Sequence, residues 1–115
     1  MGAFATRQVI IFPFPYSDFS VQKLRPALLL AEAGRGDWVL CQITSNANAD
    51  KNAIMLTDID FDDGGLQRIS YARANKLFTA NESIFQRRAG IITPNCYAKV
   101  IQTAVDLLQK GASYE

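Results

Sequence analysis

Residues 26–31 read Pro-Ala-Leu-Leu-Leu-Ala, and residues 38–43 read Trp-Val-Leu-Cys-Gln-Ile. Each is a short run of mostly apolar side chains, a pattern typical of a buried strand. The segment Gly34-Arg35-Gly36-Asp37 lies between them and has the composition of a tight turn. We therefore predict two buried strands joined by a turn, and we place the remaining elements around this pair.

Further short strands are predicted on both sides of the pair. Val9–Phe14 is apolar, and Pro13 and Pro15 indicate that this strand lies at a sheet edge or bends. The polar segment Tyr16–Leu24 is predicted to be a loop. The later predicted strands are Ala53–Leu56, Ile69–Phe78, and a last strand broken around Gly90 into Ile84–Arg88 and Ile91–Ile92.

After Ile92 the spacing of the apolar residues becomes helical. Thr93 and Pro94 are typical of an N-cap and a first helical position, and Gly111 predicts the helix end. The apolar positions at helical spacing are Tyr97, Val100, Ile101, Ala104, Val105 and Leu108. Short strands followed by one C-terminal helix predict a mainly β fold, a small antiparallel barrel forming a single domain over residues 1–115.

Composition narrows the class of protein. The chain has 115 residues, 49% of them hydrophobic and 20% charged, as expected for one folded soluble domain. No apolar run is long enough to cross a bilayer, and no signal peptide is recognisable. Cys41 and Cys96 have no metal-ligating neighbours in sequence, so we expect both to be reduced and buried. These features predict a cytoplasmic protein without a membrane partner.

The charges are unevenly distributed along the chain. The net charge is +1, but four of the eleven carboxylates lie within residues 58–63, leaving seven acidic against twelve basic side chains elsewhere. A basic nucleic-acid-binding face beside one acidic loop is one interpretation, and ordinary solvated surface is the other.

Several catalytic classes are excluded. The chain has no histidine, which removes serine–histidine and cysteine–histidine catalysis and most zinc sites. The acidic segment lacks the glycine and the final glutamate of a calcium loop, because Asp63 and Ile69 occupy those positions. We therefore predict no metal and no cofactor.

Polar residues remain at the margins of the predicted strands. Arg25 opens the second strand, Thr44 and Ser45 close the third, and Arg73 and Asn75 share one face of the fifth. A guanidinium fork fits phosphate oxygens, and hydroxyls add hydrogen bonds to the same group. From these residues alone, a phosphate site and a purely structural role are equally compatible.

Several longer motifs, in order along nearly the whole chain, resemble the MazF/PemK (Kid) toxin family. The matching segments are Phe12–Ser20 (FPFPYSDFS), Lys23–Leu30 (KLRPALLL), Cys41–Ser45 (CQITS), Gly64–Leu66 (GGL), Ser70–Thr79 (SYARANKLFT) and Arg88–Gly90 (RAG). The resemblance implies an SH3-like barrel with a C-terminal helix, a homodimer, and metal-independent cleavage of single-stranded RNA to a 2′,3′-cyclic phosphate and a 5′-hydroxyl. It also implies a cognate antitoxin protein, and contact with DNA only through the toxin–antitoxin complex.

The same resemblance assigns roles to residues. It places Arg25 and Thr44 as the catalytic pair. The possible supporting residues are Ser45, Asp18, Arg73 and Asn75, and the expected RNA contacts are Lys23, Arg73 and Lys76.

The chain departs from the family at the general base. Some members have a carboxylate or a histidine in the site, whereas this chain offers Asn75 and no histidine. A guanidinium such as that of Arg25 is a poor base because it stays protonated, so Asp18 is the nearest candidate carboxylate. Two alternatives stay open: a CcdB-like toxin that poisons DNA gyrase by binding alone, and a catalytically silent RNA-binding regulator on the same fold.

Overall fold

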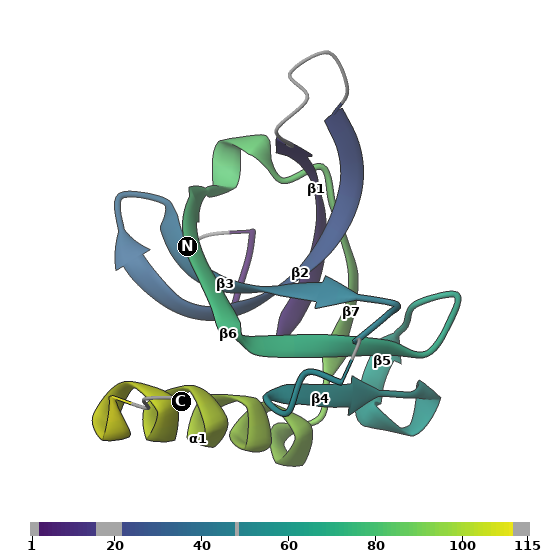
Figure 1. The fold of residues 1–115 in the computed structure, drawn as a ribbon. Helices are drawn as coiled ribbons and strands as arrows, with labels where there is room; N and C mark the ends of the chain where they lie inside the picture. The colour runs from purple at the N-terminus through teal and green to yellow at the C-terminus, as the bar shows by residue number, and fades with distance from the viewer. Residues whose placement is uncertain (1–2, 16–21, 48, 112–115) are drawn as a thin grey trace.

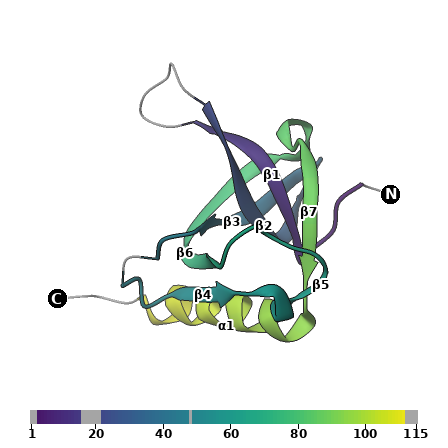
Figure 2. The same ribbon diagram turned by 90° about the vertical axis from the view of Figure 1, so that its right-hand side faces the viewer.

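Strands β2 (Gln22–Gly34) and β3 (Asp37–Thr44) pair antiparallel at the centre of the structure, with Leu28 opposite Cys41. This computed structural model describes residues 3–15, 22–47 and 49–111. The described strands form one curled antiparallel sheet in the order β4-β6-β3-β2-β1-β7-β5, and helix α1 (Pro94–Lys110) lies beneath β6 and beside β4 (Figures 1 and 2). The other elements are β1 (Gln8–Pro15), β4 (Ala53–Leu56), β5 (Phe61–Gly64), β6 (Ser70–Asn81), β7 (Arg87–Ile92) and the 3-10 turns Asp58–Asp60 and Glu82–Ile84. The predicted mainly β architecture with a C-terminal helix is confirmed.

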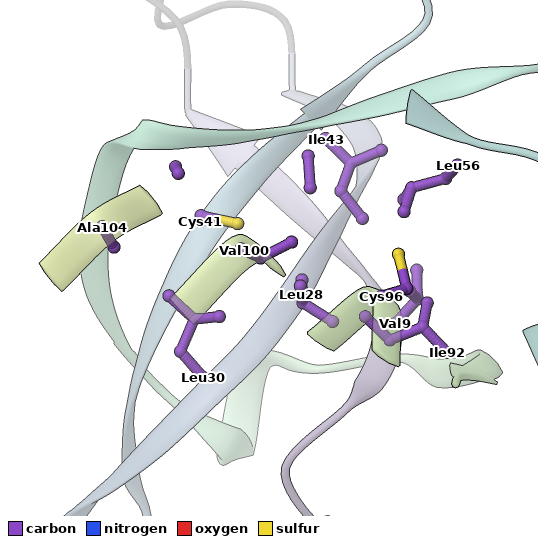
Figure 3. Packing of buried hydrophobic residues seen from close by; sticks show 12 residues of the cluster. Val9, Leu28, Leu30, Cys41, Ile43, Leu56, Ile92, Cys96, Val100 and Ala104 are labelled. Carbon is purple, nitrogen blue, oxygen red and sulfur yellow. The ribbon is translucent and has the colours of Figure 1, made fainter. Parts of the chain in front are cut away.

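The apolar run of β2 is buried on both faces of the sheet. Leu28 and Leu30 pack toward α1 in the helix cluster, whereas Ala27 and Leu29 pack on the opposite face in the aromatic cluster. Consecutive residues of a strand point to opposite faces, so a strand covered on both sides has no alternation of apolar and polar residues. The helix cluster (Figure 3) comprises Val9, Leu28, Leu30, Cys41, Ile43, Leu56, Ala72, Ala74, Ile92, Cys96, Val100 and Ala104. The aromatic cluster comprises Ile10, Phe12, Ala27, Leu29, Trp38, Leu40 and Phe85.

Helix α1 begins and ends where the sequence predicts. The Thr93 hydroxyl accepts a hydrogen bond from the Cys96 N–H at 3.1 Å, and Gly111 closes the helix in the left-handed region with φ of 51°. The Tyr97 hydroxyl donates to the Leu30 carbonyl at 2.6 Å and ties the helix to β2. Two of the apolar positions at helical spacing are exposed: Val105 is 37% and Leu108 is 69% exposed.

In strand β6, the side chains do not alternate between the two faces of the sheet along the whole strand, as the sequence pattern predicts. Its pairing with β3 jumps from Leu77 opposite Cys41 to Arg73 opposite Gln42, which leaves residues 74–76 without partners on β3. The bulge shifts the faces beyond it: Leu77 packs on the helix cluster and Phe78 on the aromatic cluster. The predicted assignment of side chains to the two faces is therefore correct only for the residues before the bulge.

Three segments differ from the prediction: the start of β2, the last strand β7, and the acidic segment that forms β5. β2 starts at Gln22, inside the segment predicted as a loop, because residues 22–24 pair with β1. Gln22 and Pro15 are opposite each other at the far end of that pairing. Within the described residues, β1 pairs with β7 only as far as Ile11. Pro13 and Pro15 lie beyond Ile11 and pair with β2 alone. This half of β1 therefore forms the predicted sheet edge.

The last strand, β7, is continuous across Gly90, and the acidic segment predicted as a loop contributes β5 to its edge. A Cβ at Gly90 would lie 2.6 Å from the Asp63 carbonyl oxygen, so glycine is what lets β5 approach. Asp62 pairs with Arg7 at 3.3 Å and Asp63 with Arg88 at 3.4 Å. The residues of β5 have low strand propensity, and they form a strand because they pair with β7.

No helix within the described residues is long and apolar enough to cross a membrane.

Replacing Thr93 tests its role as the N-cap of α1. Thr93→Ala should lower the free energy of unfolding by about 0.5–2 kcal/mol, because the Cys96 N–H loses its acceptor. Chemical denaturation followed by circular dichroism measures the change. Thr93→Ser keeps the hydroxyl and should stay close to wild type. Equal stability of the alanine and serine variants would contradict the assigned cap.

Candidate functional site

Arg25 and Thr44 lie where the buried part of the β2–β3 pair ends. Ala27 is opposite Gln42; Arg25 lies two residues before Ala27 and Thr44 two residues after Gln42, on the same face of the sheet. On its other side, Arg25 is opposite Phe12 of β1. Both side chains are half-buried. The strand pairing therefore fixes the backbone positions from which the Arg25 and Thr44 side chains extend.

Two adjoining pockets meet at this pair. The small pocket, about 240 Å³, is lined by Phe14, Arg25, Pro26, Gln42, Ile43, Thr44 and Arg73. The large pocket, about 720 Å³, shares Arg25, Pro26, Ile43 and Thr44 with the small one and extends over Lys23, Ser45, Gln67, Arg68 and Arg87, among others. Arg25 and Thr44 thus stand at the junction of both pockets, as expected for residues that bind one central group of an extended ligand.

The lining of the two pockets is positively charged. Five cations line them, and no carboxylate among the described residues does. The cations are Lys23, Arg25, Arg68, Arg73 and Arg87. Partial burial weakens the screening of Arg25 and Arg73 by solvent, so an anion placed between them is attracted more strongly than at an open surface. The arrangement suits a phosphate with further phosphates along the large pocket.

The Thr44 hydroxyl is held in place by the turn that follows β3. Its Oγ1 accepts a hydrogen bond from the Asn46 N–H at 3.1 Å and lies 3.2 Å from the Asn46 carbonyl oxygen. A hydroxyl proton rotates about the C–O bond, so it can move from that carbonyl to a phosphate oxygen. The turn thereby fixes the oxygen while the proton remains available to a ligand.

Arg73 reaches the small pocket from β6 and is held by a carboxylate. Its Nε donates to Asp50 Oδ2 at 2.9 Å, and the Asp50 side chain is only 7% exposed. Burial works to raise the pKa of the Asp50 carboxyl. The hydrogen bonds from Arg73 and the Asn52 N–H, together with the charges of Arg73 and Lys76, outweigh this and hold that pKa below its usual range. Asp50 therefore stays ionised at neutral pH.

The remaining predicted site residues are distributed differently. Ser45 and Lys23 are exposed and line the large pocket. Asn75 and Lys76 are exposed on the β6 bulge and line neither pocket. Asp18 lies outside the described residues. The structure brings Arg25, Thr44, Ser45, Lys23 and Arg73 together around the two pockets.

Sequence reasoning missed three residues of this region. Gln67 and Arg68 follow β5 and reach the large pocket, and Asp50 lies in the β3–β4 connection against Arg73. The segments on either side of Gln67 and Arg68 carry the family resemblance, but no residue pattern marked Gln67, Arg68 or Asp50 as part of a site. All three depend on pairings between segments far apart in the chain.

The two cysteines are buried in the core, away from the two pockets. Burial raises the pKa of the Cys41 thiol to about 12 and that of the Cys96 thiol to about 11. Both thiols are free and buried, as the sequence predicts, and neither lines a pocket at the site. Within the described part of the chain, no group of three His, Cys, Asp or Glu side chains is placed to hold a metal ion. Permanent cations and hydroxyls are the chemistry that this site offers.

No family profile and no curated protein matches this chain, but solved structures do. A chain of the MazE-MazF complex (Form-II) from Deinococcus radiodurans matches with a TM-score of 0.74 at 18% identity, covering 98% of this chain and 100% of that chain. A mycobacterial endoribonuclease in complex with its cognate antitoxin gives 0.66 at 18% identity, with 100% of both chains covered. The Mycobacterium tuberculosis toxin MazF-mt6 gives 0.70 at 13% identity, covering 90% and 97%. The chain therefore has the fold of MazF toxins.

The burial of both thiols predicts chemical inertness. Iodoacetamide at pH 8 should leave Cys41 and Cys96 unmodified in the folded protein, because a pKa of about 11 to 12 leaves about one thiol in a thousand or fewer as thiolate. Mass spectrometry measures the modification, and the same protein in denaturant should react at both positions. Alkylation of the folded protein at the rate of a free cysteine would contradict this description of the core.

Proposed function

We propose that this chain is a metal-independent endoribonuclease toxin of a toxin–antitoxin pair, which cleaves single-stranded RNA at short sequence motifs. The observation that supports this most directly is the position of Arg25 and Thr44 at the junction of two pockets lined by five cations and no described carboxylate. The MazF fold supports the same conclusion by analogy, since two of the matching structures are named as a toxin and an endoribonuclease.

The proposed reaction is attack of a ribose 2′-oxygen on the neighbouring phosphorus. The new O2′–P bond forms as the P–O5′ bond breaks, which leaves a 2′,3′-cyclic phosphate, and the departing 5′-oxygen takes up a proton from solvent to become a 5′-hydroxyl. Negative charge grows on the phosphoryl oxygens, so fixed cations stabilise the transition state more than the ground state. Arg25 supplies this charge, Thr44 donates a hydrogen bond to the same group, and Arg73 adds a second guanidinium from the small pocket.

The proton of the 2′-hydroxyl requires a separate acceptor, because a guanidinium stays protonated. We assign this role to Asp18 on its proximity in sequence to β2. The flanking nucleotides lie along the large pocket, where Lys23 contacts phosphates and Ser45 adds a hydrogen bond. Asn75 and Lys76, on the β6 bulge, contact RNA beyond the small pocket.

The proposed partners follow from the same fold. Matching structures are named as complexes of such a toxin with its antitoxin, so we propose a cognate antitoxin that covers the cationic pockets and blocks RNA. We further propose that the chain acts as a homodimer in the cytoplasm and reaches DNA only through the antitoxin complex. Free, buried cysteines agree with a reducing compartment.

A CcdB-like gyrase poison and a silent RNA-binding regulator are the competing functions. A toxin that acts by binding gyrase alone has no need of a concave phosphate site. The cations gathered around Arg25 therefore favour the ribonuclease.

Removing the central guanidinium tests the assignment in solution. Arg25→Ala should lower the rate of RNA cleavage by roughly 10²-fold, the usual cost of losing one charge-stabilising contact in a transition state. The assay uses a single-stranded RNA with excess chelator present. Lys99→Ala, which removes an exposed cation on α1, serves as the matched control and should cleave at the wild-type rate. Wild-type cleavage by Arg25→Ala would refute the catalytic assignment, and loss of activity in chelator would refute metal independence.

Mapping RNA ends in cells separates the ribonuclease from the gyrase poison. Induced expression should stop growth and produce new RNA 5′ ends at one recurring short motif, and Arg25→Ala cells should show neither effect. Growth arrest alone decides nothing, because a gyrase poison also causes it. Unchanged RNA ends together with gyrase-linked DNA breaks would favour the poison. An absence of growth arrest and of cleavage would favour the silent regulator.

A further inference from the structure

We infer that Asp50 is a positioning residue of the RNA-cleaving site, which holds the Arg73 guanidinium so that its terminal amino groups face the phosphate bound at Arg25 and Thr44. This inference rests on the proposed function. Asp50 itself lines neither pocket at the site and would act only through Arg73.

The geometry begins with the bulge of β6. Arg73 is the last residue before the bulge and lies between Gln42 of β3 and Ala53 of β4. Its backbone is therefore fixed by strands on both sides, but its long side chain is not. An arginine side chain has several rotatable bonds, and ordering it at a site costs conformational entropy.

The contact with Asp50 orders the Arg73 side chain before RNA binds. Asp50 Oδ2 accepts from Arg73 Nε at 2.9 Å, in a setting where the carboxylate is 7% exposed and the arginine side chain 27% exposed. Within the described residues, the terminal amino groups of Arg73 make no hydrogen bond, so they are available to a ligand in the small pocket. One nitrogen is thus used for orientation and two are left for phosphate.

Asp50 is in turn fixed by its own loop. Its Oδ1 accepts the Asn52 N–H at 2.9 Å, and its carbonyl accepts the Ala53 N–H at 3.2 Å at the start of β4. The two carboxylate oxygens therefore have different partners, one in the loop and one on Arg73. A purely structural role in this loop is the competing explanation, and the experiment must separate the two.

A double-mutant cycle makes this separation. Asp50→Ala should lower the cleavage rate constant kcat about tenfold, and Arg73→Ala should lower it further. The double variant should cleave no more slowly than Arg73→Ala alone, because Asp50 has nothing left to position. Asp50→Asn keeps one side-chain acceptor oxygen, which can face Arg73 while the loop loses its bond from the Asn52 N–H, and it should recover part of the rate. Lys51→Ala, an exposed neighbour in the same loop, is the matched control and should match wild type.

The outcomes are distinguishable. Additive losses in the double variant, or a wild-type rate for Asp50→Ala, would overturn the inference. A loss of kcat that merely follows a loss of folded protein, measured by thermal melting of each variant, would assign Asp50 to the loop structure and overturn it as well.

Failure of the proposed function has a separate signature. If wild-type protein cleaves no RNA, the ribonuclease proposal fails, and the positioning role is judged from the Arg73 Nε–H signal in nuclear magnetic resonance spectra titrated with inorganic phosphate. A sharp signal that shifts with phosphate in wild type and broadens in Asp50→Ala supports the positioning role. An identical signal in both proteins overturns it.

Discussion

Burial of β2 and β3 on both faces is the constraint on which the rest of the structure depends. Leu28 faces the helix cluster and Leu29 the aromatic cluster, and both are fully buried. Each such side chain contributes about 1.5–3 kcal/mol when it is removed from water. The two faces need separate covers: the aromatic cluster fills one side, and α1 covers the helix cluster on the other (Figure 3).

The site follows from where this burial stops. A guanidinium is costly to bury without partners, so Arg25 sits at the strand margin, where its backbone is held by β1 while its head group borders two pockets. Thr44 occupies the matching margin of β3, with its oxygen fixed by the Asn46 turn. The sheet thus holds a cation and a hydroxyl in fixed positions beside the two pockets, the preorganisation that the proposed cleavage requires.

The acidic segment contributes no carboxylate to the lining of the two pockets at the site. Asp62 and Asp63 of this segment are paired with Arg7 and Arg88. These surface ion pairs add little stability, but each places a carboxylate beside a cation that lines neither pocket. A net charge of +1 therefore coexists with a strongly positive site.

The sequence alone determined the elements whose signals are local. Apolar runs specified the central strands, and Thr93 and Gly111 specified the ends of α1. The strand margins offered Arg25 and Thr44 among several polar residues, and the family resemblance singled out this pair. Tertiary structure alone decided the strand β5, the β6 bulge, and the contact of Asp50 with Arg73, 23 residues away. Periodicity and capping act within one or two turns of chain, whereas strand pairing and ion pairs depend on which distant segments the shared core brings together.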